Sequence, residues 1–300
     1  MKKKNKKHAV FRYLRKNLTV ILLILMTLIT VGTFAWFSVT NNPKVQNLAL
    51  VADHEGNLQI ADDVDGRPGT YEDVLDLANA TKADYMNAVR LSPVTTKDGV
   101  TFFSPNYDSA TNTVGSVTPI TDQTELTNTY IYEKTFYLKA SGGGDAQAIG
   151  GAAKYEVGLV GPQTGNGASG SYILKASESV VTDSDTAANV VRISFTVNGQ
   201  TAIYEPNYEV HNASDKKAID AVGGSGGYGG YAVHQQASDG KFVNGDGSGN
   251  SQTLFTLDEG VDTLVTMRIW LEGTDVDCTN SVGSDMIKGQ IQFISKESSN

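Results

Sequence analysis

The chain has 300 residues, with 24 Lys and Arg, 33 Asp and Glu, and a single cysteine, Cys278. This length is sufficient for a domain with a substantial hydrophobic core, and one cysteine excludes an internal disulfide, zinc fingers and Cys-x-x-Cys redox motifs. The net charge of −9 and the sequence pI near 4.9 argue against nucleic-acid binding, which requires a basic surface. We therefore expect no nucleic-acid partner.

The charge is divided unevenly along the chain. Residues 1–16 carry eight Lys or Arg side chains, and no acidic residue precedes Asp53. Residues 38–300 hold the remaining 16 basic and all 33 acidic residues, a net charge of −17. Between these parts, Leu18–Phe37 is an uncharged, mostly apolar stretch of 20 residues, which is about the length of a helix that spans a bilayer. A basic flank before an apolar segment predicts that residues 38–300 lie outside the cytoplasm.

Residues 1–37 are expected to form a hydrophobic helix, for which two interpretations remain open. As a signal peptide, the segment has a basic n-region, an apolar h-region, and small residues before a cleavage position between Ala35 and Trp36. Signal peptidase is then a transient partner. As an uncleaved anchor, residues 18–37 span the membrane and Trp36 lies at the outer interface, where aromatic residues are enriched.

Beyond Ser38, short runs rich in Val, Ile, Tyr, Phe and Thr alternate with Gly, Asn, Asp and Ser clusters, which predicts a mainly β domain over residues 38–300. The predicted strands are Val45–Ala52, Leu58–Ile60, Thr129–Lys139, Lys154–Val160, Tyr172–Ala176, Val190–Val197, Thr201–Tyr204, Thr253–Leu257, Leu264–Leu271 and Gly289–Ile294. In residues 190–197 the odd positions are apolar and the even positions from Arg192 are polar, and residues 264–271 repeat the alternation. This pattern predicts a sheet that is covered on one side.

Other segments predict a helix and long loops. An apolar stripe over residues 71–89 predicts a helical insertion, with Thr70 as the N-cap and a stop at Pro93. Residues 142–170 and 223–249 each hold ten of the 31 glycines, which predicts glycine-rich loops.

No catalytic motif is convincing, so we predict no enzyme activity, no catalytic residue and no cofactor-binding residue. Residues 223–230, GGSGGYGG, match G-x-S-x-G and G-x-G-x-x-G, but a tract that is mostly glycine matches both by composition, and no βαβ unit surrounds it. His54, His211 and His234 are far apart in the sequence, and no H-E-x-x-H is present. A nucleophile pair of Cys278 with a histidine remains an alternative, because such partners meet only in the fold.

Calcium is the one cofactor that the sequence suggests. Asp63, Asp65 and Glu72 fall at positions 3, 5 and 12 of an EF-hand loop, but position 1 is Ala61, which has no side-chain oxygen. The match is therefore partial, and no metal site is predicted beyond these candidates. A second acidic cluster has no assigned role and lies beside Cys278: Glu272, Asp275 and Asp277.

Several segments resemble the TasA/camelysin-like exported proteins of Gram-positive, Firmicute-type bacteria, which are made with a SipW-type signal peptide. Residues 33–38, TFAWFS, resemble the aromatic end of those signal peptides, and residues 48–60 resemble their first mature strands. Residues 89–103 and 268–280 are similar to segments of clostridial relatives. The glycine-rich insertions have no counterpart in this resemblance.

The resemblance implies a jelly-roll-like β-sandwich with one or two short helices, displayed on the cell surface or in the biofilm matrix. It also implies self-association into fibres, in which the N-terminal segment of one subunit completes the sheet of the next. Pro43 is expected to limit the length of such a donor strand. The alternative is a membrane-tethered β-sandwich module that binds a glycan or protein ligand.

Overall fold

The computed structural model describes residues 44–52, 58–77, 91–108, 113–141, 153–160, 170–175, 187–206, 253–275, 277–278, 282 and 286–298. The chain divides into residues 1–41 and 42–300, and every described residue belongs to the second unit. The predicted signal peptide or anchor, with Ala35 and Trp36, therefore lies outside the described residues. Within the described part, no helix is long and apolar enough to cross a bilayer.

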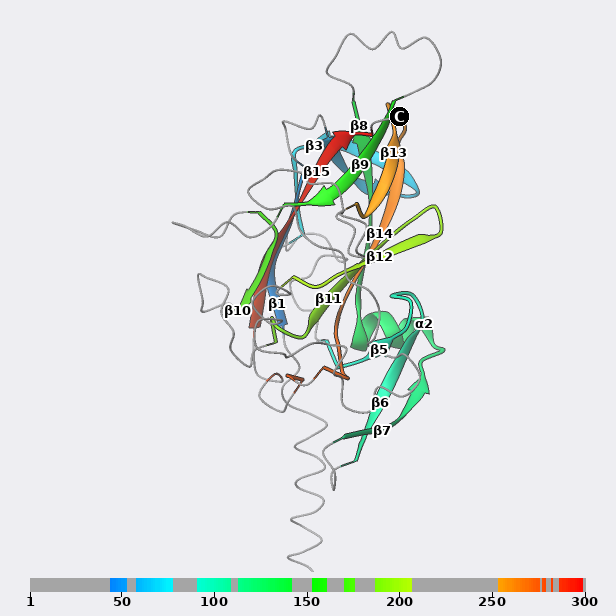
Figure 1. The fold of residues 1–300 in the computed structure, drawn as a ribbon, viewed down its shortest axis with the longest axis vertical. Coiled ribbons are helices and arrows are strands. Elements are labelled where there is room, and N and C mark those ends of the chain that lie inside the picture. The colour runs from blue at the N-terminus through cyan, green and yellow to red at the C-terminus, as the bar shows by residue number, and fades with distance from the viewer. Residues whose placement is uncertain are drawn as a thin grey trace, which may run out of the picture. The chain divides into compact units, whose positions relative to one another are not determined.

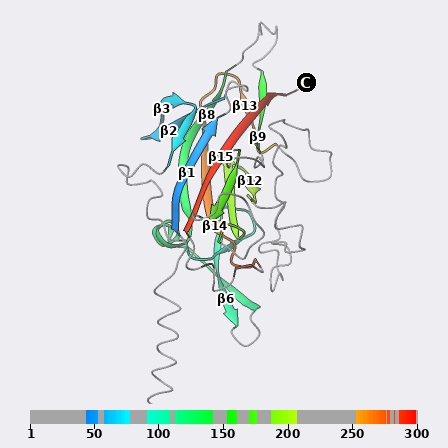
Figure 2. The same cartoon turned by 90° about the vertical axis from the view of Figure 1, so that its left-hand side faces the viewer.

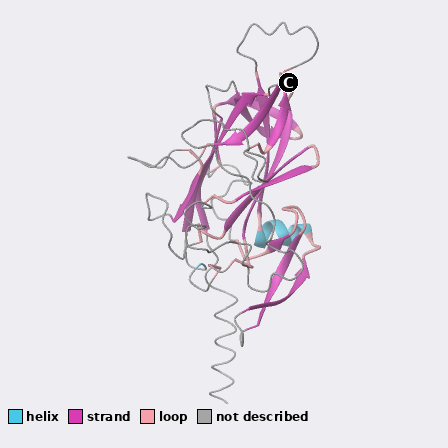
Figure 3. Cartoon of the chain, in the orientation of Figure 1, coloured by secondary structure: helices cyan, strands magenta, loops and turns pink. Residues whose placement is uncertain are grey.

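The described part of the chain is mainly β and contains two six-stranded sheets and one three-stranded sheet (Figure 1 and Figure 3). The first sheet has the order β13-β9-β15-β1-β4, with β10 also beside β15: β13 Phe255–Asp258, β9 Lys154–Leu159, β15 Met286–Glu297, β1 Lys44–Ala52, β4 Val74–Asp76 and β10 Tyr172–Lys175. The second has the order β12-β11-β14-β8-β2-β3: β12 Gln200–Tyr204, β11 Val191–Val197, β14 Thr263–Leu271, β8 Tyr132–Ala140, β2 Leu58–Val64 and β3 Arg67–Glu72. The third comprises β5 Thr95–Thr96, β6 Phe102–Asp108 and β7 Thr113–Pro119.

All ten predicted strand segments overlap an observed strand, with shifted ends. The predicted strand from Thr129 begins at Tyr132 instead, because helix α2, Gln123–Glu125, and a one-turn π-helix, Leu126–Tyr130, precede it. Asp122 caps α2 by accepting hydrogen bonds from the backbone N–H groups of Thr124 and Glu125. Of the predicted glycine-rich loops, residues 142–170 include strand β9, and residues 223–249 lie outside the described residues.

The predicted helix over residues 71–89 is wrong in its first turns, because Tyr71 and Glu72 belong to β3 and residues 74–76 form β4. The cause is a two-residue hairpin loop just before this segment. Asp65 and Gly66 both have positive φ, 53° and 78°, as a type I′ turn requires, and they lead β2 directly into β3. Residues 78–90 lie outside the described residues.

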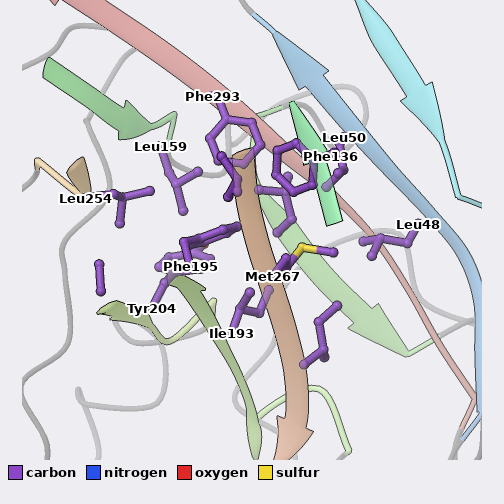
Figure 4. Close-up of a cluster of buried hydrophobic side chains, with 14 of the residues drawn as sticks. Leu48, Leu50, Phe136, Leu159, Ile193, Phe195, Tyr204, Leu254, Met267 and Phe293 are labelled. Carbon is purple, nitrogen blue, oxygen red and sulfur yellow. The ribbon is translucent and has the colours of Figure 1, made fainter. Parts of the chain in front are cut away.

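One hydrophobic core lies between the two six-stranded sheets. The ring of Phe293 on β15 lies 5.8 Å from Phe136 on β8 and 5.4 Å from Phe195 on β11, so a side chain of the first sheet contacts two strands of the second (Figure 4). Leu50 on β1 and Met267 on β14 are fully buried in the same core. The two sheets therefore face each other and share their apolar sides.

A second, smaller core lies on the other face of the second sheet. Trp270 on β14 is fully buried there and meets Phe102 on β6 edge to face, with ring centroids 5.3 Å apart. Arg192 and Ser194, on the polar face of β11, are also fully buried, and Ser194 Oγ donates to the carbonyl oxygen of Gly99. The prediction of a sheet covered on one side is therefore wrong for this part of β11 and β14.

Candidate functional site

Arg192 is the centre of a buried group of charged side chains. Its Nη2 lies 2.5 Å from Asp275 Oδ2 and 3.3 Å from Glu205 Oε1, and all three side chains are at most 3% exposed. Its Nη1 donates to the carbonyl oxygens of Asn189 and Val191, at 3.0 and 2.9 Å. Arg192 therefore links β11 to the residue that follows β12 and to the acidic turn that follows β14.

Glu272 is a second buried carboxylate that connects parts of the chain, at the start of the same turn. Its carboxylate accepts hydrogen bonds from Trp270 Nε1 at 3.2 Å and from the backbone N–H and hydroxyl of Thr274 at 3.1 and 2.7 Å. Its backbone forms an isolated bridge with Val94, which begins the segment covering this face of the sheet. The carboxylate of Glu272 thus holds the turn and the indole of the second core in fixed positions.

These contacts give the acidic cluster of residues 272–277 a structural role. Asp275 Oδ1 accepts the backbone N–H of Asp277, and the backbone N–H of Cys278 donates to the carbonyl oxygen of Asp275. Among the described residues, no group of three or more His, Cys, Asp or Glu is placed to hold a metal ion. All four histidines lie outside the described residues, so the Cys278–histidine alternative stays a prediction.

The three calcium candidates are not brought together. Asp63 Oδ1 accepts the backbone N–H of Gly66 at 2.9 Å and supports the hairpin turn, and its Oδ2 accepts the hydroxyl of Thr135 on β8 at 2.8 Å. Asp63 pairs with Pro68, whereas Glu72 lies four residues further along β3, about 13 Å away at the usual strand rise. The Asp65-Gly66 dipeptide between two strand-like runs was the sequence signal for this hairpin.

Sequence reasoning missed a polar contact between β3 and the turn before β14. The hydroxyl of Tyr71 donates to Asp262 Oδ1 at 2.8 Å, and Lys139 Nζ lies 2.9 Å from the same oxygen. Hydrogen bonds from Lys139 and then Tyr71 lower the pKa of Asp262, and burial together with the carboxylate raises the pKa of Tyr71. This exposed contact fixes the edge strand β3 to its sheet.

The N-terminal strand β1 has an unusual place in the first sheet. It lies between β15 and β4. It runs parallel to β15, the last described strand, and Figure 2 shows the two side by side. The register aligns Leu50 with Ile291 and Ala52 with Phe293, and the contact with β4 is limited to three antiparallel pairs. Leu48, Leu50 and Ala52 are all buried in the main core. The segment that follows the predicted export signal is therefore an interior strand of the folded domain.

Comparisons with known proteins do not identify this chain: no protein-family model, no curated protein and no solved structure matches it. The resemblance to TasA/camelysin-like proteins therefore stays a prediction made from the residues. The geometry of β1 and of the buried charged group is the basis for the functional interpretation.

Proposed function

We propose that this chain is an exported, non-enzymatic structural protein of a Gram-positive cell surface or extracellular matrix, and that it assembles into fibres by exchange of strand β1. The observation that carries the proposal is the position of β1, which is the first described strand after the predicted export segment and lies between β15 and β4. The predicted jelly-roll topology of the sandwich belongs to the same proposal, as does the resemblance to fibre-forming matrix proteins.

Strand exchange requires few new contacts. The β1 strand of one subunit can occupy the same slot in a neighbour, where Leu48 and Leu50 fill the same core positions and the same register with β15 is kept. The contacts of the closed monomer and of the exchanged form are then nearly equal in free energy. Protein concentration decides between the two forms, because exchange joins subunits and closure does not.

Cleavage of the predicted export segment determines when this exchange can occur. Cleavage after Ala35 leaves Trp36–Pro43, eight residues, before β1. An uncleaved segment keeps the N-terminal end of β1 beside the membrane, whereas a cleaved one frees that end to enter a second subunit. We therefore expect assembly of the mature chain only.

The test is electron microscopy and sedimentation velocity on the mature chain beginning at Trp36, over a range of concentrations. We expect oligomers that lengthen into fibres as concentration rises. Monomers that persist at the highest concentration, with and without added calcium, contradict the fibre proposal.

A membrane-tethered module that binds a glycan or protein ligand is the second candidate, favoured by the interfacial position that Trp36 takes if the apolar segment is retained. Determining the N-terminal residue of the native protein separates the two. An intact N-terminus in the membrane fraction supports the tethered module, and a chain beginning at Trp36 outside the membrane supports the matrix protein.

A further inference from the structure

Lys134 on β8 and Asp62 on β2 form an ion pair on the core-facing side of the second sheet. Lys134 Nζ lies 2.8 Å from Asp62 Oδ1, and the two side chains are 3% and 14% exposed. Along β8, Lys134 alternates with the buried Tyr132 and Phe136, so its side chain leaves the same face of the sheet as theirs. Asp62 stands directly opposite Phe136, which makes it a diagonal neighbour of Lys134 on the adjacent strand.

The buried position of Lys134 and Asp62 raises the free energy of the charged form of the pair. Two charges lose their hydration when they are buried, and their mutual attraction often does not repay that loss. Transfer of one proton from Nζ to the carboxylate gives a neutral amine beside a neutral carboxylic acid, and an apolar setting favours neutral groups over charged ones. A neutral amine and a carboxylic acid are the two reactants of amide formation.

The contact geometry also suits this reaction. Cγ of Asp62 is joined to Oδ1 by a bond of about 1.2 Å, so Nζ lies within about 4 Å of the carbon atom that it would attack. Reacting groups that a fixed fold holds side by side have effective molarities of about 10⁵–10⁸ M. Such proximity makes loss of water between two side chains feasible inside a folded domain.

We propose that the side chains of Lys134 and Asp62 become joined by an amide bond. Nζ attacks Cγ of the protonated carboxyl group, one N–C bond forms, one C–O bond breaks, and the hydroxyl leaves as water with a proton from the amine. No oxidant, reductant or other reactant is needed. The product is a covalent cross-link between strands β2 and β8, in a chain whose only cysteine is Cys278 and which therefore has no internal disulfide.

The test is the intact mass of the purified full chain together with a tryptic peptide map. We expect a mass lower than the sequence predicts by one water molecule, no cleavage after Lys134, and a branched peptide that contains both Lys134 and Asp62. A full sequence mass, with normal cleavage after Lys134, overturns the proposal. The result is independent of fibre formation, because the cross-link lies within one subunit.

Two controls separate this cross-link from other dehydrations. Succinimide formation at Asp65-Gly66 removes the same mass, but mild alkali hydrolyses it, whereas a side-chain amide survives. The variant Lys134→Arg keeps the positive charge without an attacking amine, and we expect it to have the full sequence mass. If that variant does not fold, Lys134→Met serves the same purpose. A water loss that persists in either variant contradicts the assignment to Lys134.

Discussion

The guanidinium of Arg192 is fully buried between the carboxylates of Asp275 and Glu205. Replacing it with methionine leaves both carboxylates buried without their cation. We expect Arg192→Met to lower the free energy of unfolding by about 3–5 kcal/mol, which is the usual effect of breaking a buried ion pair from one side. Chemical denaturation of the variant measures this loss directly.

Arg268 provides a matched control on β14. Its Nε lies 2.7 Å from Glu133 Oε2, but the two side chains are 16% and 28% exposed, so water screens the pair. We expect Arg268→Met to cost less than about 1 kcal/mol. Equal losses in the Arg192 and Arg268 variants would contradict the structural role that we assign to the buried group.

Asp98 makes the stability of the loop after β5 depend on pH. Partial burial acts to raise the pKa of Asp98, but hydrogen bonds from the backbone N–H groups of Thr101 and Val100 and from the hydroxyls of Thr101 and Thr96 outweigh it and lower that pKa below 3.8. A lowered pKa means that the carboxylate stabilises the folded state above about pH 4. That contribution is lost as the pH falls through the folded-state value.

The variant Asp98→Ala removes these hydrogen bonds. At pH 7 we expect it to be less stable than the native chain by about 0.5–1.5 kcal/mol, because Asp98 is exposed and water replaces part of the lost hydrogen bonding. The difference should narrow as the pH falls from about 4 through the lowered folded-state pKa of Asp98, because the native carboxylate then loses the charge that these hydrogen bonds stabilise. Denaturation curves of both proteins between pH 7 and pH 2 test this, and a constant difference over the whole range contradicts it.

At the scale of elements, the segment of residues 94–101 packs onto β11 and β12 through Gly99. Gly99 has φ of 71°, and a Cβ atom there would lie 3.0 Å from side-chain atoms of Ile203 and Ser194. Gly260, in the turn after β13, has the same φ but no atom within 4 Å of such a Cβ. The two positions therefore differ in packing and share their backbone conformation.

Alanine variants at Gly260 and Gly99 separate the free-energy cost of packing from that of backbone conformation. We expect Gly260→Ala to cost about 1–2 kcal/mol from backbone conformation alone. Gly99→Ala should cost about 1–3 kcal/mol more, because the added methyl group overpacks the contact with Ile203 and Ser194. Thermal or chemical unfolding of both variants gives the difference, and equal costs would show that the segment is not tightly packed on the sheet.

An element could be predicted from the sequence when the residues that form it are neighbours in the chain, and not when they are far apart. Period-two alternation placed β11 and β14 correctly, because it depends on neighbours in the sequence. Burial of Trp270 could not be predicted that way, since most of the apolar residues packed against it come from residues 94–131, far away in the chain. The carboxylate that pairs with Arg192 at 2.5 Å, Asp275, is 83 residues away. The helix expected from Tyr71 failed because pairing with β2 and β1 outweighed a local apolar stripe.

The candidate site was predictable from the sequence to the same limited extent: residues close together in the chain were noticed, and their distant partners were not. The sequence drew attention to Glu272, Asp275 and Asp277 as a cluster, but their partners Arg192, Trp270 and Val94 appear only in the fold. Asp63, Asp65 and Glu72 matched part of a calcium loop by spacing, and spacing alone does not distinguish such a loop from a hairpin.

At the scale of the whole molecule, the negative charge of residues 38–300 affects assembly. Residues 38–300 carry a net charge of −17, so subunits repel one another at low ionic strength. Raising ionic strength from about 0.01 M to 0.15 M shortens the Debye length from about 30 Å to 8 Å. We therefore expect fibres of the mature chain to form at lower protein concentration in the higher salt, and sedimentation at both ionic strengths measures this. The opposite salt dependence would indicate assembly through complementary charges instead.

The most direct test of strand exchange is to lock β1 in its own subunit. Val51 on β1 pairs with Gln292 on β15, and both side chains are partly exposed. Neighbouring strands lie about 4.7–4.9 Å apart, which suits a disulfide. In a Cys278→Ser background, Val51→Cys with Gln292→Cys, oxidised at low concentration, should stay monomeric when concentrated and should form fibres after reduction. The single variant Val51→Cys, kept reduced, controls for the substitution and should form fibres throughout. Fibres that form from the oxidised, locked monomer would contradict strand exchange.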